Sequence, residues 1–324
     1  MKKYSKEDFS YVVSSITGFT DQVGGELLAK ALVGATTPKY VNVRLGIKGT
    51  QALNLLDSNP SFQAGACGWS ASGTTTFTQR NITTCAERVN ESLCPDDLYP
   101  TYQSMLLQPG QTEETVPFEQ VIADLKVKQI QQRIEQKLWQ ATVSGGDCFD
   151  GFKTLIASGQ TGIAVSASGT TFSATAAYGT NGNPITEVDK LIVALSDDAS
   201  SREDLVCFMS YANYRLYVQA LTKANFFANY IGGASAIGNM NLEAVHPNAN
   251  VKVIPTIGLA GSNSVVIGPA EYMVVGFDLL SDHERMEIWW SRDNNEVRFR
   301  ANYNYGAQIA KFGSTAYFAV NGLS

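Results

Sequence analysis

The sequence predicts an α+β fold, and three stretches of the chain carry that prediction. Residues 117–146 have the apolar spacing of one long amphipathic helix. Residues 40–94 have the composition of an extended β-hairpin, and residues 264–320 alternate short apolar strands with turns. A smaller unit of helices and strands lies between the long helix and this C-terminal β-region.

The helix predicted over residues 117–146 is the element around which the rest of the chain is arranged. Pro117 suits a first helical position because its missing N–H would be unpaired there. Gly145 and Gly146 allow the left-handed residue that commonly ends a helix. At roughly 1.5 Å per residue the helix would be about 40 Å long, so we expect it to span the molecule as a strut. The predicted buried stripe is Phe118, Val121, Ile122, Leu125, Ile130, Ile134 and Leu138.

Ahead of this helix the sequence predicts a polar arm followed by a long hairpin. Residues 1–40 mix polar and small residues and form the arm. Residues 41–45 alternate like a strand, residues 74–84 are rich in β-branched residues, and the tip between them is rich in Gly, Ser and Asn. The hairpin has few large aliphatic residues, and an isolated two-stranded ribbon is marginal in water. We therefore expect it to pack on something else, such as a second copy of the chain.

The sequence pattern in the middle of the chain predicts one compact α/β unit. Residues 186–189 open a helix in the manner of a capping box, with Asp189 in place of the usual glutamate. A buried strand at 205–210 and a helix at 211–221 follow, and a Gly-rich loop at 229–240 leads to a strand at 251–255. The helix carries tyrosines at a spacing that favours a packing face: Tyr211, Tyr214 and Tyr217.

The C-terminal region predicts β-strands, including a hairpin around Asp293. In the second strand of that hairpin, Val297, Phe299 and Ala301 face one side while Arg298 and Arg300 face the other. One face is therefore buried and the other is solvated or packed on a partner. The predicted strands are 264–267, 272–277, 285–290, 296–303 and 317–320.

Composition and charge exclude several classes of protein. A chain of 324 residues with 44% hydrophobic and 17% charged residues is that of a folded protein with a large core. The net charge of −6 means that the whole chain does not attract nucleic acid through a basic field. We read no secretory signal and no membrane span, so we expect a soluble, cytoplasmic product. The five cysteines are odd in number, and we expect the chain to fold without disulfide bonds.

Cys67, Cys85 and Cys94 lie in one region and raise the question of a zinc site. Structural zinc sites usually use closely spaced pairs of ligands, whereas these three are far apart and neither histidine is near. The favoured interpretation is that they are small buried thiols.

No stretch of the sequence has the pattern of an active site. Residues 68–73 resemble a nucleophile elbow around Ser70 but lack the second required glycine. His246 and His283 sit beside turn-like residues without a matched base or nucleophile, and we interpret both as surface histidines. The Gly-rich residues 232–238 lack the Lys-Ser/Thr ending of a phosphate-binding loop. The sequence therefore predicts no catalytic, cofactor or metal site, and no enzyme.

The order of these parts resembles the major capsid proteins of tailed double-stranded DNA bacteriophages, which have the HK97 fold. The local sequence is similar to capsid proteins of phages that infect Bacteroidetes, including crAss-like phages. The stretches that carry this likeness are Cys67-Gly-Trp, the Thr-rich run from Thr74, Val89-Asn-Glu-Ser-Leu-Cys-Pro, Gly276-Phe-Asp-Leu and Ile288-Trp-Trp with Val297-Arg-Phe-Arg.

The resemblance implies a division of the chain into four parts. Residues 1–39 would be an N-terminal arm, and residues 40–95 an E-loop that lies over a neighbouring subunit. The long helix would be the spine of a P-domain. The implied P-domain comprises 96–150 and 271–306, and the implied α/β A-domain, which meets its copies at five- and six-fold axes, comprises 151–270 and 307–324.

The resemblance also implies a function. The chain would self-assemble as homo-hexamers and homo-pentamers into an icosahedral shell that encloses phage DNA without reading its sequence. Its location would be the virion, after assembly in the host bacterial cytoplasm, with no membrane contact. Portal, scaffolding and decoration proteins would be its other partners, and the missing charged helical segment before the arm implies that any scaffolding protein is separate.

Three other interpretations stay open at the level of sequence, and the third in order is a hydrolase that uses Ser70 or a histidine. An encapsulin-like nanocompartment shell would share the fold and differ in cargo. A β-rich surface-binding module is a different class, and only the Gly, Ser and Thr content and the aromatic strands favour it. The sequence does not determine the triangulation number, the host, covalent cross-linking or the maturation protease.

Overall fold

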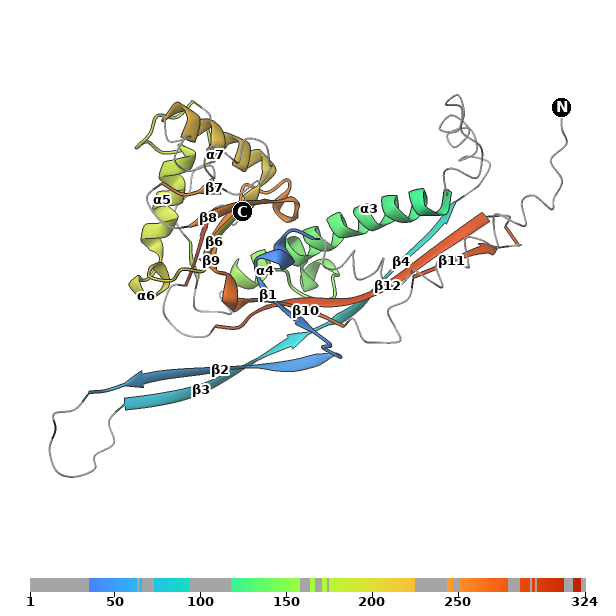
Figure 1. Ribbon diagram of the computed structural model, residues 1–324, viewed down its shortest axis with the longest axis horizontal. Coiled ribbons are helices and arrows are strands. Elements are labelled where there is room, and N and C mark those ends of the chain that lie inside the picture. The colour runs from blue at the N-terminus through green and yellow to red at the C-terminus, as the bar shows by residue number, and fades with distance from the viewer. Residues whose placement is uncertain are drawn as a thin grey trace.

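The structure is a computed structural model, and it describes residues 35–62, 65, 73–93, 118–157, 164–166, 171–173, 175–224, 244–247, 251–278, 286–291, 293–294, 296–311 and 317–321. Figure 1 shows a body with two sheets, a long helix, and a two-stranded ribbon that projects from the body. Most of the predicted N-terminal arm, residues 1–34, and the Gly-rich loop at 229–240 lie outside the described residues.

The sheet beside the long helix is organised by one long strand, β12 (Glu296–Ile309). On one edge β12 pairs antiparallel with β4 (Cys85–Leu93), and on the other with β10 (Met273–Phe277) and β11 (Met286–Ser291). β1 (Asn42–Leu45) adds to β10 in parallel and completes five strands. The predicted alternation in β12 is confirmed, because Phe299 and Ala301 are buried.

The long helix, α3 (Phe118–Gln140), lies along this sheet (Figure 1). Its buried stripe contains Ile130, Ile134 and Leu138, as predicted, together with Val127. Leu125 is 54% exposed, so its predicted burial is wrong. The predicted end is also wrong by several residues: α3 stops at Gln140, and Gly146 with φ 94° closes the short 3-10 turn that follows.

Ion pairs connect α3 to the sheet. Lys126 pairs with Glu91, and Lys137 Nζ lies 2.5 Å from Glu87 Oε1. Glu87 also accepts a hydrogen bond of 2.6 Å from the hydroxyl of Tyr305 on β12. These contacts join α3 to β4, and Glu87 of β4 in turn to β12.

The second sheet has six strands in the order β5-β13-β9-β6-β8-β7. Its central strand β6 (Leu205–Ser210) is buried along its whole length, as the sequence predicts. The other strands are β5 (Ala164–Ser166), β7 (Ala244–Val245), β8 (Lys252–Thr256), β9 (Val265–Pro269) and β13 (Phe318–Asn321).

Helices α5 (Pro184–Ala194) and α7 (Tyr211–Lys223) pack beside this sheet (Figure 1). The predicted capping box is wrong: Asn183 is the N-cap, and its side chain accepts from the backbone N–H groups of Ile185 and Thr186. The predicted packing face of α7 is confirmed for Tyr214 and Tyr217, which are buried, and is wrong for Tyr211, which is 36% exposed. The remaining helical elements are η1 (Thr37–Lys39), η2 (Val143–Gly145), α4 (Phe152–Ala157), α6 (Asp197–Ser200), η3 (Ile257–Leu259) and η4 (Ala270–Tyr272).

The projecting ribbon consists of β2 (Thr50–Pro60) and β3 (Gly73–Thr83). The long hairpin is therefore confirmed, but its first strand is not residues 41–45. Those residues form β1, whose partner β10 belongs to the main sheet. The chain turns at Gly46 and Gly49, both with positive φ, between β1 and β2. This turn separates the ribbon from the body.

The cysteines differ from expectation. Cys85, at the start of β4, is bonded to Cys148, and their Cα atoms are 6.0 Å apart. The interpretation of Cys85 as a buried thiol, and of the chain as free of disulfide bonds, is therefore wrong. The cause is that the segment after α3 returns to the start of β4. Cys207 is a buried free thiol, and Cys67 and Cys94 lie outside the described residues.

Candidate functional site

The ribbon is fixed to the body at its base by a small apolar cluster. Ile47, Leu53, Ile82 and Val274 are each no more than 1% exposed and pack together. Gly306 of β12 passes so close to the ribbon that a Cβ there would lie 2.2 Å from the carbonyl oxygen of Thr83. Two further hydrogen bonds join the base to β12: Arg80 Nη1 to the Ile309 carbonyl at 3.0 Å, and Gln308 Nε2 to the Asn81 carbonyl at 2.9 Å.

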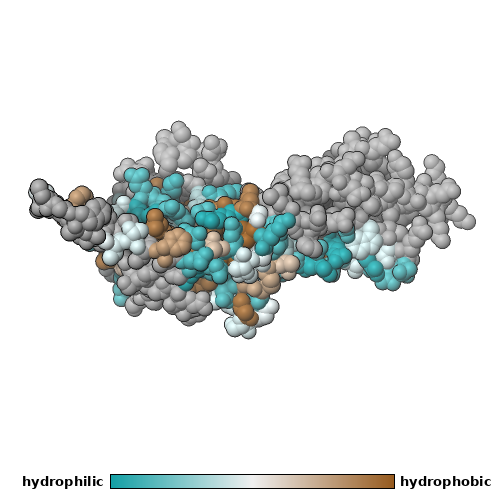
Figure 2. All heavy atoms as spheres, turned by 90° about the horizontal axis from the view of Figure 1, so that it is seen from below, coloured by the Kyte–Doolittle hydropathy of each residue, from teal (hydrophilic) through white to brown (hydrophobic). Residues whose placement is uncertain are grey.

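The outer half of the ribbon has the opposite character. Leu56 and Phe77 are cross-strand partners, and they are 67% and 64% exposed. Phe62, just after β2, is 98% exposed. On the face seen in Figure 2, brown hydrophobic residues lie among teal hydrophilic ones instead of forming one continuous apolar surface. Such scattered apolar side chains suit several small contacts better than one large interface.

A buried carboxylate joins the N-terminal part of the described chain to both sheets. Glu135 of α3 is 1% exposed and accepts hydrogen bonds from the backbone N–H of Thr37 at 3.1 Å and from the hydroxyl of Thr37. The hydroxyl of Thr256, at the end of β8, is a third donor. Trp139 Nε1 donates to Thr37 Oγ1 at 2.7 Å. The contacts hold the segment before β1, the helix α3 and the second sheet in one arrangement.

Burial raises the pKa of Glu135 above 4.5, although hydrogen bonds from Thr256 and Thr37 oppose that shift. The folded state therefore holds this proton more tightly than the unfolded state. The free energy of unfolding should then fall as pH rises from the unfolded pKa through the raised folded pKa. We expect Glu135→Gln to remove this part of the slope, measured by denaturant unfolding over a pH series. Glu203→Gln, at an exposed carboxylate, should keep the wild-type slope, and an unchanged slope in E135Q contradicts the assignment.

His246 is not a surface histidine, which corrects the interpretation from sequence. It is 1% exposed, with Nε2 2.8 Å from Asp189 Oδ1 and Nδ1 2.8 Å from the hydroxyl of Tyr217. Tyr217 is 0% exposed, and burial raises the pKa of its hydroxyl. A buried, protonated phenol has no access to substrate, so we interpret this triad as a structural connection between α5, α7 and the strand β7.

The remaining candidate residues, Ser70, His283 and the Gly-rich residues 232–238, lie outside the described residues. Within the part of the chain that is described, no three His, Cys, Asp or Glu side chains come together as metal ligands. The described helices include none with the length and hydropathy that a membrane crossing requires. The ribbon and the sheet surfaces are therefore the candidate functional features.

Comparison with known proteins bears on the fold. No protein-family model matches the chain, and no curated protein matches its sequence. A chain of the satellite phage P4 procapsid, which includes size determination (Sid) protein, is 10% identical, with a TM-score of 0.57 over 92% of this chain and 89% of that chain. A chain of the capsid of an empty GTA particle is 12% identical, with a TM-score of 0.56 over 90% and 89%. A chain from Microbacterium phage Oxtober96 is 10% identical, with a TM-score of 0.53 over 89% and 90%.

The chain has an HK97-like fold. At this identity the likeness is one of fold, and it confirms the predicted α+β class and the resemblance to phage capsid proteins at that level. Because the HK97-like fold covers nearly the whole of this chain and of the three matched chains, no large part of the described architecture is foreign to it. The narrower resemblance to phages of Bacteroidetes stays a prediction.

Proposed function

We propose that this chain is a major capsid protein of a tailed double-stranded DNA phage, of the kind found in phages of Bacteroidetes. The observation that carries the proposal is the projecting ribbon, whose outer half exposes Leu56 and Phe77. The HK97-like fold supports it, because matched chains come from a procapsid and a capsid. The chain then self-assembles as hexamers and pentamers into an icosahedral shell around the genome.

The ribbon is the element that needs a second copy. Its base is buried on its own chain, whereas Leu56 and Phe77 in its outer half are largely exposed. Covering two large side chains stabilises a contact by about 2 kcal/mol, at roughly 25 cal/mol per Å² of apolar surface. Repetition over many subunits would turn such modest contacts into a closed shell.

The division into parts follows from this proposal. Residues 1–39 act as an arm and residues 40–95 as an E-loop over a neighbour. Residues 96–150 with 271–306 form the P-domain. Residues 151–270 with 307–324 form the A-domain, which meets its copies at the five- and six-fold axes.

The proposed setting is the virion, after assembly in the cytoplasm of the host bacterium. The portal, scaffolding and decoration proteins are the proposed partners. DNA is enclosed without sequence-specific contacts, and the negative net charge of −6 suits a wall that does not hold the genome tightly. No enzymatic role or cofactor is proposed.

Electron microscopy of the purified chain tests the proposal. We expect closed shells of uniform diameter made of five- and six-fold rings. A chain that stays monomeric in every condition contradicts the proposal. An encapsulin-like shell would also close, so nuclease-protected DNA in particles from infected cells separates the two: a phage head protects a genome-length molecule, and a nanocompartment protects protein cargo.

The double variant Leu56→Ser and Phe77→Ser tests the ribbon directly. We expect it to raise the concentration needed for assembly roughly thirtyfold, since about 2 kcal/mol per contact is lost. The melting temperature of the unassembled chain should stay unchanged, because both side chains are exposed. Val193→Ser is the control, since Val193 on α5 is 84% exposed and lies outside the ribbon. Equal effects of the two changes would argue for general surface hydrophobicity instead of a ribbon contact.

A further inference from the structure

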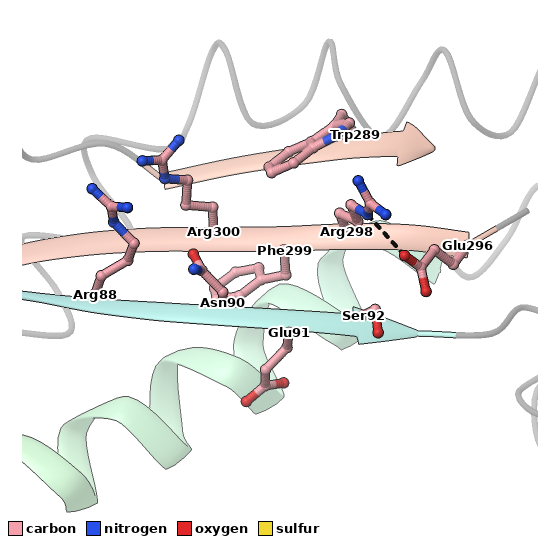
Figure 3. Close-up of a pocket in the computed structure, with 9 residues that line it drawn as sticks. All are labelled: Arg88, Asn90, Glu91, Ser92, Trp289, Glu296, Arg298, Phe299 and Arg300. Atoms are coloured by element: carbon pink, nitrogen blue, oxygen red, sulfur yellow. Dashed lines mark hydrogen bonds and ion pairs between the residues drawn. The ribbon is translucent and has the colours of Figure 1, made fainter. Parts of the chain in front are cut away.

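A groove lies on the face of the five-stranded sheet that points away from α3. Its volume is about 430 Å³. Arg88 rises from β4, Arg298 and Arg300 from β12, and Trp289 from β11, all on the same side (Figure 3). Glu91 points to the opposite side, where it pairs with Lys126 of α3. The groove is therefore a separate surface from the contact between sheet and helix.

Two of the three arginines, Arg88 and Arg300, form no ion pair with a carboxylate of the described residues. Arg298 Nε is bonded to Glu296 Oε1 at 2.8 Å, and Arg88 uses its Nε for Asn302 Oδ1 at 3.1 Å. Arg300 Nε is buried and has no hydrogen-bond partner among the described residues. A guanidinium group carries five N–H donors, and a buried donor without a partner costs free energy. The groove is thus incomplete without an acceptor.

We propose that this groove is a socket for a carboxylate side chain of a second copy of the chain. Arg88 and Arg300 are close enough in register to act together: Arg300 pairs with Asn90, which is two residues from Arg88 on β4. A guanidinium group can donate two parallel hydrogen bonds to one carboxylate in a fork-like geometry. Trp289 supplies a flat apolar wall beside it, and Trp and Arg are the side chains enriched among residues that dominate binding energy in protein interfaces.

The charges around the groove favour a carboxylate over the phosphate backbone of a nucleic acid. Glu287 lies directly across the strand pair from Arg300, and Glu296 holds Arg298. A continuous phosphate chain along this face would meet both carboxylates, whereas a single carboxylate enters between Arg88 and Arg300 alone. The net charge of −6 also repels a polyanion and gives each copy acidic side chains to offer.

The test uses the full-length chain and compares two double variants that each remove two positive charges. Arg88→Gln with Arg300→Gln removes the two guanidinium groups of the groove that have no carboxylate partner among the described residues. Lys128→Gln with Arg133→Gln is the matched control, because both residues are exposed on α3. Association is followed by light scattering against concentration at low and high salt. Melting of the unassembled chain and binding of a fluorescent oligonucleotide are measured in parallel.

We expect the groove variant to need at least about a tenfold higher concentration to associate, with the difference shrinking at high salt. The control should stay within about twofold of wild type, and both should melt like wild type. If R88Q/R300Q fails to fold, R88K/R300K keeps the charge and loses the fork, and it should weaken association several-fold.

Four results would overturn the socket. They are wild-type association in the groove variant, equal weakening by the control, loss of oligonucleotide binding alone, and a lowered melting temperature that marks an acceptor from the same chain. The inference rests on the proposed function, but the two fail differently. A wild-type chain that never associates overturns both, whereas normal shells from R88Q/R300Q overturn only the socket.

Discussion

Replacing Trp139 by alanine is expected to lower the free energy of unfolding by about 4 kcal/mol, in the range found when large buried side chains are truncated. Trp139 is 0% exposed and lies where α3 meets the second sheet. Its ring centroid is 5.0 Å from that of Phe208 on β6 and 5.5 Å from that of Phe152 on α4. The change would also leave Thr37 without the indole donor. Denaturant unfolding followed by circular dichroism measures the loss.

Gly258 provides a matched partner for this experiment. A Cβ at Gly258 would lie 2.1 Å from Trp139 Cδ1, so Gly258→Ala alone should cost about 2 kcal/mol by overpacking. Part of that cost should disappear when Trp139 is already alanine, because the indole ring that the added Cβ would clash with is then absent. The Glu135 carbonyl, at 2.6 Å, would still be crowded. Strictly additive losses would show that the two sites do not share this contact.

The buried stripe of α3 shows what helical periodicity predicts and where its reading fails. Ile130, Ile134 and Leu138 recur every four residues and are buried as predicted. Leu125 precedes Ile130 by five residues, which is about 140° past a full turn, so its phase places it on the outer face. Its hydrophobicity alone had suggested burial. At the edge of a buried stripe, the angular position of a residue around the helix thus predicts its burial better than its hydrophobicity does.

Strand existence was predictable, but strand partners were less so. Alternation marks residues 41–45 as a strand, and a short distance in sequence favoured pairing within the hairpin. The structure pairs that strand, β1, with β10 instead, more than two hundred residues further along the chain. Alternation in the local sequence identifies a strand but does not identify its partner strand when that partner is far away in the chain. Only the packing of the whole sheet selects the partner strand.

The same reason explains the polar contacts that the sequence did not reveal. His246 contacts Asp189 and Tyr217 through its ring nitrogens only because folding brings α5, α7 and β7 together. Glu135 has the spacing of an ordinary helix-surface charge, and its hydroxyl donors come from Thr37 and Thr256. Each of these groups depends on tertiary neighbours distant in sequence. A buried polar network of this kind leaves no pattern in a single sequence.

Reducing the bond between Cys85 and Cys148 is expected to lower the free energy of unfolding by about 4 kcal/mol. The two residues are 63 apart, and the cost of closing a loop of that length in the unfolded chain sets the magnitude. The bond ties the first residue of β4, beside the ribbon base, to the segment that follows α3. Denaturant unfolding of the wild-type chain with and without dithiothreitol measures the difference.

Cys148→Ser separates this effect from the reaction of the other thiols with the reductant. The variant should unfold like the reduced wild type, and dithiothreitol should not change it further. Cys207 stays reduced in both proteins, since it is fully buried and burial raises the pKa of its thiol. If reductant destabilises C148S as much as wild type, the stabilising bond involves other cysteines. If it changes neither protein, the link between β4 and the end of α3 is held by packing and by the pairing of Lys137 with Glu87 and Asp147 instead of by a covalent bond.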